Sequence, residues 1–157
     1  MGSLWGDIKK EDKIIVPNTI IKEQDKILGE ITSGLVNVEI KEIKNKRLKD
    51  AEFAYDVSLI SYRMENYNYP IFRIEYNVSI YPVRVILNVN IQDIDLDPLY
   101  QIGNNEHGEY VLEATDKENF IRLLENILAS KQMTNIIRSI MALSEQIGKE
   151  PDFEIPF

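Results

Sequence analysis

Three aspartates at alternate positions, Asp93, Asp95 and Asp97, form the densest carboxylate cluster of the sequence. In an extended chain alternate side chains point the same way, so these carboxylates would share one face. Such oxygen ligands suit hard cations such as Ca²⁺ or Mg²⁺. The spacing matches the first half of an EF-hand loop, but Pro98 replaces its glycine and Asn104 its final glutamate. We interpret the aspartates as a polar strand face that contacts a partner, and leave open whether they converge on a metal.

Two consecutive glutamate–lysine pairs offer a second carboxylate chemistry. The stretches 39–41 and 42–44 both read Glu-Ile-Lys, the E-x-K spacing of metal-dependent nucleases. In such a site two carboxylates hold a divalent metal and the lysine steadies the attacking water. The second acid would have to come from Asp25 or Glu30, which lie in an expected helix rather than in a preceding hairpin. A strand with an alternating solvent-facing side explains Glu39 and Lys41 equally well.

Nucleophilic and nucleotide chemistry finds little support in the sequence. The chain has no cysteine and one histidine, His107, which excludes thiolate catalysis, disulfides and multi-histidine zinc sites. His107 lies in a glycine-flanked loop between Glu106 and Glu109, and no nucleophile is flagged beside it. The common phosphate-binding and hydrolase motifs are also missing from the sequence. We therefore predict no catalytic residue, no cofactor and no metal ligand, and interpret His107 as a solvated loop residue.

Tyrosines gather in one stretch of the chain. Five of the eight tyrosines lie between residues 62 and 81, and Tyr67 and Tyr69 alternate with asparagines in a segment that resembles a turn. Tyrosine beside asparagine is an effective contact composition, because it provides large area at low entropy cost and adaptable hydrogen bonds. We predict that Tyr67, Tyr69 and Tyr81, together with the three aspartates, contact a partner. The apolar end of the chain, 153–157, either packs internally or binds a partner.

The elements that must position these residues follow from hydrophobic periodicity. Spacing of three and four predicts a helix from about residue 17 to 34 and helical segments over 116–128 and 133–147. Thr115, with Glu118 three residues later, has the form of a capping box. Alternation predicts strands over 36–40, 53–59, 72–80 and 83–91, with a short fifth near 110–112. The alternation slips by one residue at Tyr81–Pro82, which favours two paired strands over one long strand.

These elements predict an α+β domain. We expect an antiparallel sheet of four to five strands, with the N-terminal helix and one long or two shorter C-terminal helices packed on one face. A single domain would span residues 1–157, with 1–16 and 149–157 as peripheral tails. The N-terminus does not have the form of a signal peptide, and we expect a cytoplasmic protein of bacterial or phage origin without a membrane segment.

Charge narrows the expected partners. The net charge is −8, and residues 51–115 hold 3 basic and 10 acidic side chains. Acidic surfaces repel nucleic acid and anionic membranes but attract basic proteins. We therefore expect a non-enzymatic protein-binding domain, such as an inhibitor or immunity-type protein, an adaptor or a chaperone-like holder that acts on a basic partner. The alternatives are a metal-dependent hydrolase or nuclease, and a structural subunit of a phage or bacterial assembly that forms a homo-oligomer.

Overall fold

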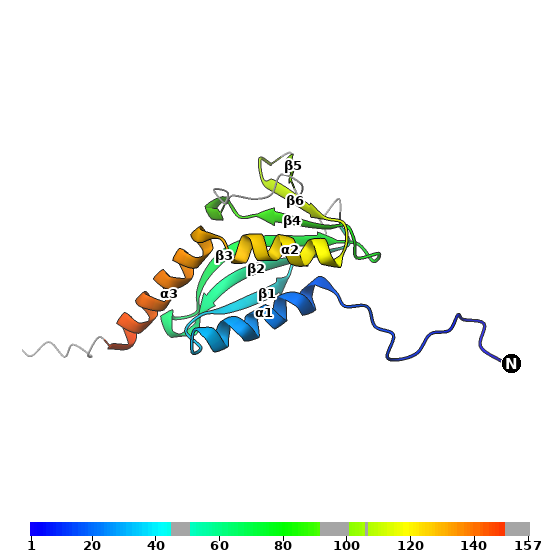
Figure 1. The fold of residues 1–157 in the computed structure, drawn as a ribbon, viewed down its shortest axis with the longest axis horizontal. Helices are drawn as coiled ribbons and strands as arrows, with labels where there is room; N and C mark the ends of the chain where they lie inside the picture. Colours follow the sequence, from blue (N-terminus) through cyan, green and yellow to red (C-terminus); the bar gives the residue numbers. More distant parts are fainter. Residues whose placement is uncertain (45–50, 92–100, 106, 150–157) are drawn as a thin grey trace, which may run out of the picture.

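The computed structural model describes residues 1–44, 51–91, 101–105 and 107–149. Their architecture is α+β, as predicted, and Figure 1 shows helices in front of one twisted sheet. The sheet is antiparallel, with the strand order β1-β2-β3-β4-β6-β5. The strands are β1 (Asn37–Glu42), β2 (Phe53–Ser61), β3 (Tyr67–Tyr76), β4 (Val83–Leu87), β5 (Gln101–Asn104) and β6 (Tyr110–Ala114).

The core lies between the sheet and the helices because alternate strand residues turn their apolar side chains to the same face. In the paired register Val38 faces Leu59, Tyr55 faces Ile74, and Ile74 faces Val85 on the next strand. The opposite face of the sheet carries most of the charge of the strands. Its charged residues are Glu39, Lys41, Asp56, Arg73, Glu75, Arg84 and Glu113.

Two helices cover the apolar face. Helix α1 (Pro17–Ile31) buries Ile20 and Ile21, and α2 (Lys117–Leu128) buries Phe120, Leu123, Leu124 and Ile127. At the start of α1, the Tyr76 hydroxyl of β3 donates a hydrogen bond to Asn18 Oδ1 at 2.6 Å. Burial raises the pKa of Tyr76 far above the ordinary tyrosine value, which keeps this hydroxyl protonated and able to donate. These contacts hold α1 and α2 on the same side of the sheet, where they contact each other.

The C-terminal helical region divides into two helices, one of the two predicted arrangements. Two residues separate α2 from helix α3 (Lys131–Lys149), and Ser130 Oγ accepts the Met133 backbone N–H at 3.1 Å as the cap of α3. Figure 1 shows α3 leaving the end of α2 at a steep angle. It packs on η1 (Tyr62–Met64), a short 3₁₀ turn. A buried hydrogen bond of 2.8 Å between the hydroxyls of Ser61 and Ser144 fixes this contact.

The paired-strand interpretation of the slip at Tyr81–Pro82 is confirmed. Strands β3 and β4 pair antiparallel, and the turn between them contains a cis Tyr81–Pro82 bond and Ile80 at a φ of 71°. The turn uses the extra residue, so Val83 and Val85 return to the core face. The predicted third strand was therefore too long at its end, because Val78 lies in this turn and is exposed.

Three local predictions were wrong. Residues 67–70 are the first part of β3 rather than a turn, because the chain reverses earlier, at Glu65 and Asn66 with φ of 54° and 59°. Strand β5 lies in a stretch where we predicted no strand, which brings the sheet of the described residues to six strands instead of four to five. Asp116 rather than Thr115 caps α2, since its carboxylate accepts the Asn119 N–H at 2.8 Å. Aspartate and threonine both suit this position, so the residue types do not separate them.

Candidate functional site

An open apolar groove lies between α1 and α2. It encloses about 400 Å³, within the range of about 300–1,000 Å³ that is typical of ligand clefts. Its floor is formed by Val38 of β1 and Leu59 of β2, and its far end by Ile137 of α3. The complete lining is Ile20, Gln24, Ile27, Leu28, Ile31, Val38, Leu59, Ile121, Leu124, Glu125, Leu128, Ala129 and Ile137. We call this feature the α1–α2 groove.

The groove exists because each helix presents more apolar surface than the sheet covers. On α1, Ile20 and Ile21 are buried, whereas Ile27 is 45% exposed and Ile31 is 72% exposed. On α2, Phe120 is fully buried and the next residue, Ile121, is 43% exposed. A helix that packs only on the sheet normally has polar residues at such exposed positions. Large aliphatic side chains that remain exposed along one continuous groove are typical of a binding surface.

Glutamates flank two of the exposed isoleucines, Ile27 and Ile121. Ile27 has Glu23 four residues before it and Glu30 three residues after it on α1. Ile121 has Glu118 three residues before it and Glu125 four residues after it on α2. Residues three and four apart lie on the same face of a helix, and all four glutamates are solvent-exposed. Each apolar wall of the groove therefore carries a carboxylate one turn above and one turn below its exposed isoleucine.

Helix α1 satisfies one backbone donor on the edge strand β1. Asp25 Oδ1 accepts the Val38 N–H at 2.7 Å and the Asn37 side-chain amide at 3.3 Å. This carboxylate satisfies an edge-strand donor that would otherwise be open to another chain. Asp25 is thereby engaged in structure, on the helix side of β1, whereas Glu39 and Lys41 belong to the opposite face of the sheet. The E-x-K interpretation consequently finds no partner acid in Asp25.

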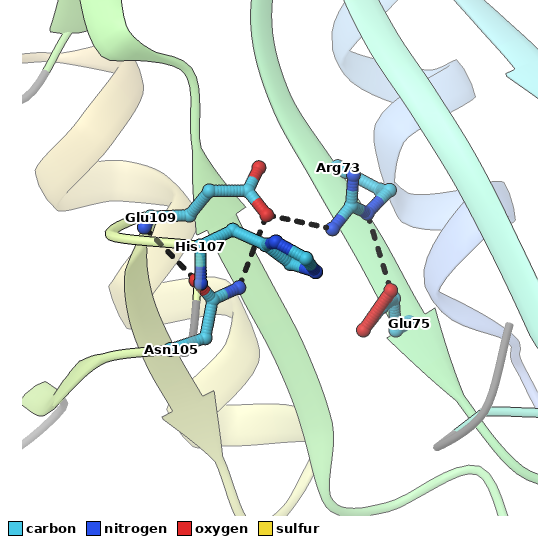
Figure 2. A network of polar contacts seen from close by, with 5 residues as sticks. All are labelled: Arg73, Glu75, Asn105, His107 and Glu109. Carbon is cyan, nitrogen blue, oxygen red and sulfur yellow. Dashed lines mark hydrogen bonds and ion pairs between the residues drawn. The ribbon is translucent and has the colours of Figure 1, made fainter.

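A polar network occupies the other face of the sheet. Arg73 of β3 contacts Glu75 at 3.1 Å and Glu109 at 3.4 Å, and Asn105 donates to the same Glu109 oxygen at 3.0 Å. Figure 2 shows the His107 side chain extending from the same loop toward Arg73. Strand β4 lies between β3 and β6, so the Arg73–Glu109 contact crosses it above Ile86, which is 3% exposed. The network fastens the β5–β6 loop over an apolar patch and includes no nucleophile.

Glu109 contributes to stability in a pH-dependent way. The Asn105 hydrogen bond, and then Arg73 and His107, hold the pKa of Glu109 below its usual value against the opposing effect of burial. A lowered folded-state pKa means that the stabilisation is complete above the unfolded pKa of about 4.3 and is lost as the pH falls through the folded pKa. Because the contact is partly exposed, we expect Glu109→Gln to lower the free energy of unfolding by about 0.5–1 kcal/mol at pH 7.

Urea unfolding of both proteins at pH 7 and at pH 3 checks this prediction. The difference between wild type and Glu109→Gln should shrink at the lower pH, because pH 3 lies below the unfolded pKa and the stabilisation is lost as the pH falls toward the lowered folded-state pKa. Glu113→Gln is the matched control, since Glu113 lies on the same face of β6 and has no ion pair among the residues described. A difference that is equal at both pH values would show that the charge of Glu109 is irrelevant to stability.

The predicted contact residues occupy different parts of the molecule. Tyr67 is 40% exposed at the start of β3, while Tyr69 is partly buried against the core. Tyr81 also packs on the core and its hydroxyl is buried, which raises its pKa. Asp93, Asp95 and Asp97 lie outside the described residues, as do Glu106 and the apolar residues 153–157. The structure thus does not gather the described tyrosines into one surface, and their contact role stays a prediction.

The sequence analysis did not predict the groove, although both helices that form it have unusually wide apolar stripes in the sequence. The apolar stripe of α1 continues through Ile27, Leu28 and Ile31, and that of α2 includes Ile121 as well as Leu124 and Leu128. Both stripes are wider than contact with one sheet requires, but periodicity does not distinguish a wide core face from a core face beside a groove. Only the relative placement of the two helices separates these possibilities.

Searches for a metal site, for a membrane-spanning helix and for similar proteins did not point to a second candidate site. Among the described residues, no three histidine, aspartate or glutamate side chains are placed to hold a metal ion. In the same part of the chain, none of the helices combines the length and the apolar character that a membrane crossing requires. Comparisons with known protein families, with curated proteins and with solved structures found no match.

Proposed function

We propose that this chain is a non-enzymatic protein-binding domain that holds an apolar segment of a basic protein in the α1–α2 groove. The observation that carries the proposal is the groove itself, with Ile27, Ile31 and Ile121 exposed along its walls. Covering these side chains by a partner removes apolar surface from water and is therefore favourable. Adaptors, inhibitors and chaperone-like holders all use surfaces of this kind.

The shape of the groove supports a peptide segment as the ligand. The stretch of α1 from Ile20 to Ile31 is about 16 Å long at 1.5 Å per residue, which equals the length of about five extended residues. Groove recognition between helices relies on a few apolar anchor residues rather than on a deep cavity. A short extended or helical segment with two or three apolar side chains meets these requirements.

Charge supports a basic flank on that segment. Glu125 is the charged side chain among the lining residues, and Glu23, Glu30 and Glu118 stand one helical turn from the exposed isoleucines. Lys26, Lys117 and Arg122 also lie within one turn of these glutamates or isoleucines, but none of the three lines the groove, whereas Glu125 does. Carboxylates around an apolar surface favour lysine or arginine beside the apolar anchors of the ligand, particularly at low salt.

Binding of three labelled ten-residue peptides, followed by fluorescence anisotropy, tests the proposal. One peptide has an apolar centre with lysine flanks, the second has the same centre with glutamate flanks, and the third has a serine centre with lysine flanks. We expect the first to bind most tightly, the second about tenfold more weakly at low salt, and the third not measurably. Equal binding of the first and third peptides, or no binding of the first, would refute the proposal.

A further inference from the structure

We propose that the α1–α2 groove of one copy receives the N-terminal arm (residues 1–16) of a second copy, so that two chains exchange arms. This inference rests on the proposed function in that it uses the same groove. The second copy of this chain would occupy the groove with its arm. Any other protein partner would then compete with that arm for the groove.

The arm has the composition of a groove ligand. Leu4, Trp5 and Ile8 are 88%, 82% and 72% exposed, and Ile14 and Ile15 are exposed as well. An isolated exposed apolar side chain is ordinary, but the arm exposes five large ones in two short groups, 4–8 and 14–15, which are separated by the charged residues 9–13. The arm and the groove are thus two unpartnered apolar surfaces within the described part of one chain.

The direction of the arm favours a second copy over its own groove. Pro17 is buried at the first turn of α1, and Val16 before it is extended, with φ −88° and ψ 157°. A residue before proline is restricted to such extended conformations, so the chain does not reverse where it leaves α1. Figure 1 shows the arm running away from the body, on the side opposite to the course of α1. A second copy can meet it without any change in this direction.

Length and charge also match. Leu4 to Ile8 spans about 13 Å when extended, which fits within the groove wall of about 16 Å from Ile20 to Ile31. The arm contains three lysines and three acidic residues, so residues 17–157 carry the whole net charge of −8. A neutral segment can enter an acidic surface that repels the rest of a second copy. Lys9 and Lys10, which follow Ile8 directly, would lie near the glutamates of α1 and α2.

Exchange in both directions provides enough interface for a stable dimer. The twelve residues from Leu4 to Ile15 would expose roughly 1,900 Å² as an extended chain, at about 1.45 Å² per dalton. Burying a third of each arm, with an equal area on each groove, removes about 2,500 Å² in total, within the range of specific dimers. The arrangement is symmetric and closed, because each copy gives one arm and receives one. A protein partner would then have to displace an arm before it occupies the groove.

Trp5 is the single tryptophan of the chain and reports on the arm directly. The experiment mixes two variants of the full chain. The arm variant, Leu4→Ser with Trp5→Ser and Ile8→Ser, keeps its groove but has no tryptophan. The groove variant, Ile27→Gln with Ile121→Gln, keeps its arm and Trp5 but has a weakened groove. All five substitutions replace exposed side chains, and circular dichroism confirms that both variants are folded.

We expect the Trp5 emission of the groove variant to shift to shorter wavelength when the arm variant is added, with formation of a mixed dimer on sizing chromatography. Wild type should show the same shift with rising protein concentration. A groove variant whose emission stays that of a solvated indole after addition of the arm variant would overturn the proposal. A blue shift in a wild-type protein that elutes as a monomer on sizing chromatography would also overturn it, because the arm would then occupy its own groove.

The two proposals fail in different ways. The lysine-flanked apolar peptide is titrated into the arm variant, whose groove is intact and has no competing arm. Peptide binding without any Trp5 shift in the mixture would refute arm exchange and support the proposed function. A Trp5 shift without peptide binding would support arm exchange and refute the proposed function. If both hold, the peptide should bind the arm variant about five- to tenfold more tightly than concentrated wild type.

Discussion

Replacing Ile27 and Ile121 together by glutamine is expected to weaken binding of the lysine-flanked apolar peptide by about 100-fold. Both side chains are nearly half exposed, and a ligand in the groove would cover the remainder of each. Losing this burial on two residues, and covering an amide in place of a methyl group, costs about 3 kcal/mol of binding free energy. Glutamine is uncharged and a good helix former, so neither the flanking glutamates nor the helices are disturbed.

The same double substitution should leave stability almost unchanged. Exposed positions away from the core change the free energy of unfolding by about 0.5 kcal/mol or less. Val78→Gln with Val89→Gln is the matched control, because these side chains are 76% and 74% exposed and lie outside the groove. Peptide titrations followed by anisotropy compare the three proteins. If the control lost as much affinity as the groove variant, general surface hydrophobicity rather than the groove would account for binding.

Phe120→Ala is expected to lower the free energy of unfolding by about 3–5 kcal/mol. Phe120 is completely buried and is among the largest side chains of the core, where it lies between α2 and the sheet. Truncation removes its transfer free energy and leaves a cavity that α2 can close only by moving. Because α2 forms one wall of the groove, binding of the apolar peptide should weaken together with stability.

Chemical denaturation measures this prediction, and the adjacent residue provides its control. Ile121→Ala removes a side chain of similar chemistry from the same helix, but at a position that is 43% exposed, and should cost about 1 kcal/mol or less. The two substitutions separate the roles of neighbouring residues: Phe120 holds α2 on the sheet, and Ile121 presents the groove wall. Equal losses of stability would show that Ile121 belongs to the core as fully as Phe120 does.

Elements with a strong local pattern could be predicted from the sequence. The stripe of α1, the alternation of β2 and the stripes of α2 and α3 each reflect one buried face of a regular element, which periodicity reports directly. The break between α2 and α3 was marked by Ser130, which favours a cap over a helix interior. Strand β5 has only four residues and contains Gly103, so it showed no alternation to recognise.

The prediction of a turn at residues 67–70 was wrong for a related reason. Asparagine and proline at 66–70 are turn residues by composition, but Tyr67 and Tyr69 also alternate with polar neighbours as a strand does. Pairing with β2 decided between these interpretations, since Ser61 faces Tyr67 and Leu59 faces Tyr69 in the sheet. Such pairing joins residues from two strands and is not visible within either segment.

The sequence by itself determined the α+β class, the order of most elements and the lack of cysteine, because these depend on composition and local periodicity. The tertiary structure alone decided where the candidate site lies. It placed Asp25 on the edge of β1, gathered Arg73 and Glu109 across β4, and set α1 apart from α2 so that Ile27 and Ile121 face a shared groove. The width of the groove depends on how both helices pack on the sheet. This packing involves residues from several elements, so the sequence of either helix alone does not reveal it.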